Sequence, residues 1–141
     1  MKLLLLGVFL LSMFNSETQN SGEIQLLIKK TKSDKGVIQV LIFNKEEGFP
    51  EEHKKAIKAL SVPVSNSSAK VTIGDLPPGN YAISVFHDEN SDGKFRKNIV
   101  GIPLDRYGFS NNPMLKFGPP SFSKCAVAIE NVPVEVEISL R

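Results

Sequence analysis

The chain has 141 residues, with 17 Lys or Arg, 15 Asp or Glu and one Cys, and its formal net charge is +2. This length suits a single domain, and the near balance of charges excludes the broad basic surface by which proteins hold nucleic acid. The single cysteine excludes an intramolecular disulfide framework and a cysteine-based zinc cluster.

The N-terminal segment is typical of a secretory signal peptide. Lys2 precedes an apolar run over residues 3–14, and polar residues end this run before it reaches the roughly 20 residues of a membrane span. Small residues allow cleavage before Gln19, and a retained N-terminal anchor is the alternative. We therefore expect a cleaved signal peptide (1–18) and an extracytoplasmic domain (19–141), periplasmic or secreted, without a transmembrane segment.

The first two expected strands follow the signal segment. Apolar and polar residues alternate over residues 24–29, which places Ile24, Leu26 and Ile28 on a buried face. After a turn-rich stretch, residues 36–43 are apolar on both faces, which is typical of a central strand. We expect these two strands to pair as a hairpin.

The hydrophobic period changes between Gly48 and Leu60. Pro50 suits the first turn of a helix, and Ala56, Ile57 and Leu60 lie three to four residues apart. This stretch predicts one short helix or helical turn.

Strand patterns resume in the second half of the chain, over residues 70–73, 80–87, 124–129 and 134–140. In the third of these, Cys125 lies on the same strand face as Val127 and Ile129, which favours a buried, unreactive thiol over a nucleophile. Several short strands and one helical stretch predict an all-β fold. We expect a single antiparallel β-sandwich, transthyretin-like or immunoglobulin-like, with one short helix and a long ordered loop region over residues 88–123.

The sequence resembles a known family through an ordered set of motifs. They lie at residues 43–50, 76–82, 87–94, 101–103, 107–112 and 117–122. Together they resemble an exported bacterial family of unknown function, domain-of-unknown-function family 2141, over nearly the whole mature chain. The resemblance implies an extracytoplasmic β-rich domain and brings no established activity. Similar members usually carry an acidic residue two positions after Lys94, where this chain has Arg96.

One motif in the long loop region is a candidate calcium site. Asp88, Asn90 and Asp92 match the first ligand positions of a calcium-binding loop, whose alternate side chains converge on one point. The later ligand positions hold Arg96 and Ile99, which supply no oxygen. Calcium is therefore the one candidate cofactor, and a turn whose side chains bond its own backbone is the alternative.

Catalysis is a further alternative. His87 ends a strand on its inward side, where it could bond a loop carbonyl, bind a metal or act as a base. Together with Ser110 and Asp105 it supplies the residue types of a hydrolase triad, but no Gly-x-Ser-x-Gly elbow is present.

The aromatic residues of the long loop region allow two interpretations. Tyr107, Phe109, Phe117 and Phe122 either plug the end of the sandwich or line an exposed groove beside amide side chains. We favour a non-enzymatic module that binds a small ligand or an envelope protein through residues 87–98 and 107–122. The predicted ligand-binding residues are His87, Tyr107, Phe109, Ser110, Asn111 and Asn112.

Overall fold

A computed structural model describes residues 21–141. The expected signal peptide lies outside the described residues. The described chain forms eight strands, one 3-10 turn and one short helix: β1 Gly22–Lys29, β2 Val37–Phe43, η1 His53–Lys55, β3 Lys58–Pro63, β4 Ser68–Leu76, β5 Gly79–Asp88, β6 Tyr107–Phe109, α1 Phe122–Cys125, β7 Val127–Ile129 and β8 Pro133–Ser139. The predicted all-β class is confirmed.

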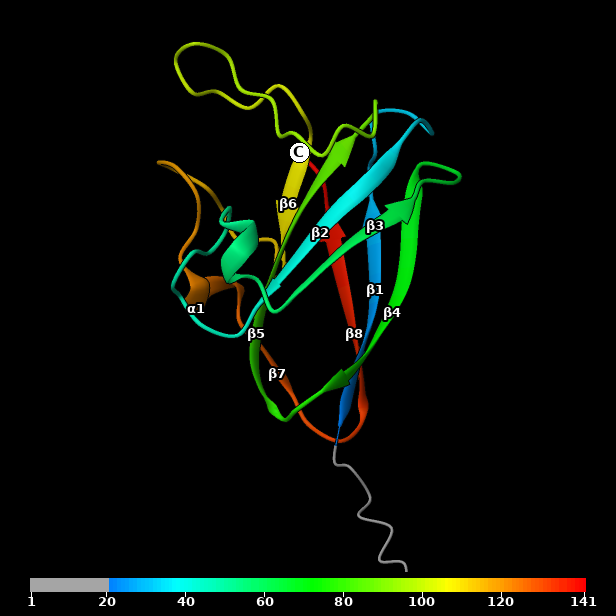
Figure 1. Cartoon of the computed structure of the whole chain (residues 1–141), viewed down its shortest axis with the longest axis vertical. Helices are drawn as coiled ribbons and strands as arrows, with labels where there is room; N and C mark the ends of the chain where they lie inside the picture. Colours follow the sequence, from blue (N-terminus) through cyan, green and yellow to red (C-terminus); the bar gives the residue numbers. More distant parts are fainter. Residues whose placement is uncertain (1–20) are drawn as a thin grey trace, which may run out of the picture.

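The strands form two sheets (Figure 1). The smaller sheet has the order β4-β1-β8, and the larger has the order β3-β2-β5-β6, with β7 beside one end of β5. All pairings are antiparallel except that of β1 with β8, which is parallel. The expectation of antiparallel pairing throughout is therefore wrong at this pair of strands, which come from opposite ends of the described chain.

One core fills the space between the two sheets. Ile24, Leu26 and Ile28 of β1 are buried as predicted, and β2, β5 and β8 contribute their own alternate residues to the same cluster. The last strand follows its prediction, since Val136, Ile138 and Leu140 are all buried. Alternation of apolar and polar residues thus places the inner face of both sheets.

The predicted β1–β2 hairpin is wrong. β1 pairs with β4 and β8, whereas β2 is central in the other sheet, between β3 and β5. The connection crosses between sheets because the inner faces of both strands must meet across the core. It runs close to the end of β5: Gly36 has a φ of +68°, and a Cβ there would lie 2.0 Å from the Asp88 carbonyl oxygen.

The predicted helix after Pro50 is reduced to the three-residue turn η1. Residues 58–63 instead form β3, which begins after the Ile57 N–H donates to the Ile42 carbonyl at 2.8 Å. Leu60 and Val62 then face the core with a period of two. Pairing with the apolar strand β2 therefore outweighs the helical spacing of a few apolar residues.

The predicted strand over residues 124–129 is correct only at its end, where β7 forms. Cys125 closes the helix α1 and is fully buried, as predicted, but it packs with Ala82 and Phe109 rather than with β7. Among the described residues, no helix is long and apolar enough to cross a membrane.

Candidate functional site

The outer face of the larger sheet carries apolar residues as well as its inner face. In β2 and β5, the residues that alternate with the core positions include Leu41, Phe43 and Phe86. Tyr107 and Phe109 of β6 extend this surface, because they pair with Phe86 and Ser84 of β5. A surface of this kind is costly to leave in water, so it requires a cover or a ligand.

A second hydrophobic cluster covers one part of this outer face. Ala82, Phe109 and Cys125 form its buried centre, and Phe49 and Phe122 pack against it from the loops. Phe49 makes edge-on ring contacts to Phe43, Phe109 and Phe122, with centroid distances of 5.4, 6.1 and 6.0 Å. These loop aromatics are therefore core, as in the plug interpretation, whereas Phe117 is 97% exposed.

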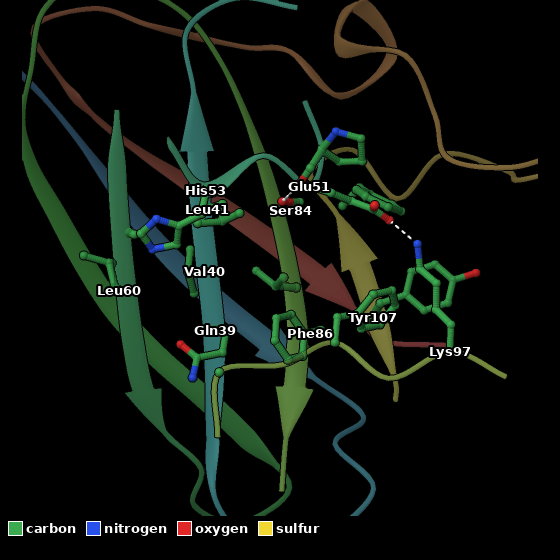
Figure 2. Close-up of a pocket in the computed structure, with 16 residues that line it drawn as sticks. Gln39, Val40, Leu41, Glu51, His53, Leu60, Ser84, Phe86, Lys97 and Tyr107 are labelled. Carbon is green, nitrogen blue, oxygen red and sulfur yellow. Dashed lines mark hydrogen bonds and ion pairs between the residues drawn. The ribbon is translucent and has the colours of Figure 1, made fainter. Parts of the chain in front are cut away.

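The other part of the outer face is an open groove of about 480 Å³. Leu41 and Phe86 lie on its floor, and Phe95 forms a wall by packing against Phe86 and Tyr107 at centroid distances of 5.2 and 6.0 Å (Figure 2). The residues that line it are Gln39, Val40, Leu41, Pro50, Glu51, His53, Ala59, Leu60, Ser84, Val85, Phe86, Gly93, Phe95, Lys97, Tyr107 and Phe109.

Polar groups are few and lie mainly at the groove's rim. Lys97 Nζ forms an ion pair with Glu51 Oε1 at 2.7 Å, which joins the loop after β5 to the turn before η1 (Figure 2). The same ammonium lies 5.4 Å from the centre of the Phe95 ring. On the floor, Ser84 Oγ donates to the Pro50 carbonyl at 2.7 Å, which fastens that turn over the sheet.

His87 lies outside the groove, on the inner side of β5, and is 1% exposed. Its Nδ1 accepts a hydrogen bond from the Lys32 N–H at 3.2 Å, so Nε2 is the donor to the Lys35 carbonyl at 2.8 Å. His87 thus joins the end of β5 to the loop between β1 and β2. This hydrogen bond to a loop carbonyl is one of the three roles that the sequence allowed for His87.

Ser110 is fully buried at the other end of the β5–β6 pairing. Its Oγ accepts from the Ile83 N–H at 2.9 Å and donates to the Cys125 carbonyl at 2.6 Å. Ile83 and His87 are four residues apart on one strand, a separation of about 13 Å. The two side chains are therefore not brought together.

Asp105, the third residue of the supposed triad, is paired with Arg96. Asp105 Oδ2 accepts from the Arg96 N–H, and Oδ1 accepts from Arg96 Nε, each at 2.8 Å. The Asp105 side chain is 3% exposed, and its hydrogen bond raises the pKa of the Arg96 guanidinium. Arg96, where the family resemblance predicted an acidic residue, therefore has a structural role.

The candidate calcium loop is held by its own hydrogen bonds. Asp88 Oδ2 accepts from the Gly93 N–H at 2.7 Å and from Gln39 Nε2 at 2.8 Å, and Asp88 Oδ1 accepts from the Asp92 N–H at 3.3 Å. A bond from the Lys94 N–H, together with Asn90, lowers the pKa of Asp92. Within residues 21–141 no three His, Cys, Asp or Glu side chains form a cluster that could hold a metal ion. The turn interpretation accounts for these side chains without a cation.

The predicted amides also bond the main chain. Asn111 Nδ2 donates to the Ala126 carbonyl at 2.9 Å, and Asn112 bonds to both Glu137 and Ser139 of β8. Both asparagines have positive φ, at 65° and 43°, a conformation that this residue tolerates. Of the six predicted ligand-binding residues, the structure brings only Tyr107 and Phe109 into the groove.

Sequence reasoning missed Leu41, Phe86 and Glu51, whereas Phe95 and Lys97 lie within the predicted binding segment 87–98 without having been named as site residues. A signal for Phe86 was present, because it belongs to the alternate set of residues in the predicted strand over 80–87. Nothing in the sequence brings Glu51 close to Lys97, since 46 residues separate them.

The chain was compared with known families, curated proteins and solved structures. The family model described as "Uncharacterized protein conserved in bacteria (DUF2141)" matches residues 26–137. The chain belongs to this family. No curated protein and no solved structure matches it. The DUF2141 match spans every residue that lines the groove, from Gln39 to Phe109, so the groove lies wholly inside the family domain.

Proposed function

We propose that this DUF2141 protein is a non-enzymatic module that binds a small amphipathic ligand in the groove on the larger sheet. The observation that carries the proposal is the groove itself, about 480 Å³ in volume, whose lining is mainly apolar and includes the ion pair of Glu51 with Lys97. Small-molecule sites typically measure about 300–1,000 Å³ and share this division of apolar and polar lining.

The lining suggests the chemistry of the ligand. Leu41, Phe86, Phe95 and Tyr107 offer flat apolar surfaces that suit a ring or a short acyl chain. At the rim, Lys97 is already paired with Glu51, and a ligand acid could replace that carboxylate. The favoured ligand therefore has an apolar body and a single acidic group.

A binding role is also supported by how the potential catalytic groups are used. His87 and Ser110 are both buried, and each is bonded to main-chain groups. Neither side chain lines the groove. Hydrolysis would require both to leave these partners, so binding is the simpler function.

The test uses 8-anilinonaphthalene-1-sulfonate, a fluorescent probe that has an aromatic body and one acidic group. We expect the purified protein to bind it with saturable, one-site fluorescence, and Leu41→Asp to weaken this binding at least about tenfold. Leu27→Asp is the matched control, because Leu27 is also half-buried and lies on the outer face of a central strand, but in the other sheet.

The outcome is decided by the difference between the two variants. Equal probe binding by wild type and Leu41→Asp would contradict the proposal, as would an equal loss in Leu27→Asp. Circular dichroism and a thermal melt of each variant confirm that any loss arises in a folded protein. Lys97→Met, which removes the rim cation, is expected to weaken probe binding about threefold to tenfold without unfolding the chain.

We also propose that the protein is exported and extracytoplasmic, either periplasmic or secreted. The apolar run over residues 3–14 after Lys2 supports this. Expression of the full chain in a bacterial host should yield an extracytoplasmic product that begins at Gln19, as measured by intact mass. An uncleaved chain in the cytoplasmic fraction contradicts it.

We propose, finally, that the two packed sheets form a sandwich of the transthyretin-like or immunoglobulin-like type. The shared core between the sheets supports this finer assignment. An experimental structure, compared with both types strand by strand, tests it.

A further inference from the structure

A projecting hairpin rises from the end of the molecule that is uppermost in Figure 1. We call residues 96–105 the tip hairpin. The Leu104 N–H donates to the Arg96 carbonyl at 2.9 Å, and the Asn98 N–H donates to the Ile102 carbonyl at 2.9 Å. The Asn98 side chain accepts from the N–H groups of Val100 and Ile102 at 3.0 and 2.9 Å. The tip hairpin therefore has a defined shape.

This shape turns four aliphatic side chains toward solvent. Ile99 and Val100 are 104% and 73% exposed, and Ile102 and Leu104 are 59% and 57% exposed. Within residues 21–141 they belong to neither hydrophobic cluster, although the hairpin's base is fixed by the Asp105–Arg96 pair. A clustered apolar surface on an ordered projection marks an interaction site.

The tip hairpin and its base carry more cations than carboxylates, although Arg96 is paired with Asp105 and Lys97 with Glu51. Residues 94–104 contain Lys94, Arg96 and Lys97 and no acidic residue. The opposite end of the molecule has the reverse composition, since residues 21–25, 74–82 and 126–135 contain four carboxylates and no Lys or Arg. The exposed aliphatic Val132 lies at that acidic end and is 62% exposed.

We propose that the tip hairpin inserts into the surface of an anionic phospholipid membrane. Aliphatic side chains would enter the boundary of the acyl region, while the cations at positions 94–97 would lie among the phosphates. A stable protein complex needs about 800 Å² from each partner, whereas four aliphatic residues on a narrow turn supply only a few hundred Å². The small area and the cations thus favour a lipid surface over a protein partner.

This inference goes beyond the groove, with which the tip hairpin shares only Lys97. The four aliphatic residues of the tip hairpin do not line the groove, and Leu41 does not belong to the hairpin. Probe binding in the groove and vesicle binding by the hairpin can therefore fail separately.

The first experiment is co-sedimentation of the purified protein with sucrose-loaded vesicles. We expect binding to vesicles of phosphatidylcholine mixed with phosphatidylglycerol, and at least about tenfold weaker binding to phosphatidylcholine alone. Ile99→Asp combined with Val100→Asp should reduce binding to the mixed vesicles at least about tenfold. Val132→Asp is the matched control and should bind as wild type does.

A second experiment places a reporter at the tip. The chain contains no tryptophan, so Val100→Trp introduces a single fluorophore. Its emission should shift to shorter wavelength on addition of mixed vesicles, and a water-soluble quencher should then reach it less well. Val132→Trp should show neither the shift in emission nor the reduced quenching.

Three results would overturn the proposal. They are no binding to mixed vesicles at low salt, equal binding by the double aspartate variant, and an unchanged Val100→Trp spectrum. Light scattering supplies a further contradiction: if wild type self-associates and the double variant does not, the tip hairpin is a contact between copies of the chain.

Discussion

The outer faces of the two sheets differ although the same alternation builds both. On the smaller sheet, the outward residues around Leu27 are polar, and together they line a shallow hollow of about 570 Å³: Gln25, Lys70, Thr72, Glu135 and Glu137. On the larger sheet, Phe43, Phe86 and Phe109 occupy the equivalent outward positions and carry a second hydrophobic cluster and a groove. A sheet of this protein therefore carries apolar residues on both faces only where loops are available to cover part of its outer face.

The loops account for the difference. Residues 44–57 and 89–126 connect strands of the larger sheet or return to it, and they bring Phe49, Phe95 and Phe122 onto its outer face. Among residues 21–141, none of these aromatic ring contacts lies on the smaller sheet. The long loop region is thus a third layer over part of one sheet.

The largest effect is expected from removing an aromatic ring beneath that layer. Phe43 is fully buried on the outward side of β2 and contacts Phe49. Phe43→Ala should lower the free energy of unfolding by about 3–4 kcal/mol, because a large cavity replaces the ring. Leu27→Ala on the smaller sheet should cost under about 1 kcal/mol. Urea unfolding measures both, and equal losses would contradict the comparison.

The next effect concerns the anchor of the long loop. Asp105→Ala removes a buried carboxylate that accepts from the Arg96 main chain and side chain, so we expect a loss of about 2 kcal/mol. Arg96→Ala combined with Asp105→Ala should cost less than the sum of the single variants, because the two groups share one interaction. Losses under about 0.5 kcal/mol in urea unfolding would mean that the hairpin base contributes nothing.

A smaller effect tests whether the second cluster is dry. Burial raises the pKa of the Cys125 thiol from 9.0 to about 11. The folded state therefore keeps this proton to higher pH than the unfolded chain does. The resulting stability is complete below pH 9 and is lost as pH rises toward 11.

Cys125→Ala isolates this contribution. Between pH 9 and 11 the wild type should lose about 1–2 kcal/mol more than the variant, as measured by urea unfolding at each pH. Parallel pH profiles would show that solvent reaches the thiol. Alkylation by iodoacetamide, slow in the folded protein and fast after unfolding, checks the same point by another method.

The smallest effect is expected on the open face. Lys29 Nζ lies 3.0 Å from Glu137 Oε1, and both side chains are about half exposed. Glu137→Gln should change stability by less than about 0.5 kcal/mol, and about 1 M NaCl should abolish the difference. A larger change would mean that this face is less solvated than the comparison implies.

Much of the inner core was predictable from the sequence. Alternation alone placed Ile24, Leu26, Ile28, Val136 and Ile138, because one side of each strand must meet the other sheet. The same pattern could not show which strands pair. β1 and β2 are neighbours in the chain, but their partners are set by contacts with residues 68–88 and 133–139.

The site was less predictable, because the same residue types serve structure and function. The residues that look like site residues all bond main-chain groups of loops or strands instead: His87, Ser110, Asn111 and Asn112. Conversely, the aliphatic run over residues 99–104 looks like core and is exposed. The sequence shows which chemical groups these side chains carry, but it did not show that Ser110 is buried or that Ile99 and Val100 are exposed.

The parallel pairing of β1 with β8 has a consequence for the order of folding. β1 is central in its sheet, and one of its two partners, β8, is the last strand of the described residues. Contacts between such distant segments slow folding, because a long loop must close before they form. The smaller sheet can be completed only after the ribosome has added residues 133–139. Until then β1 pairs only with β4, and its other edge has no partner strand among residues 21–132.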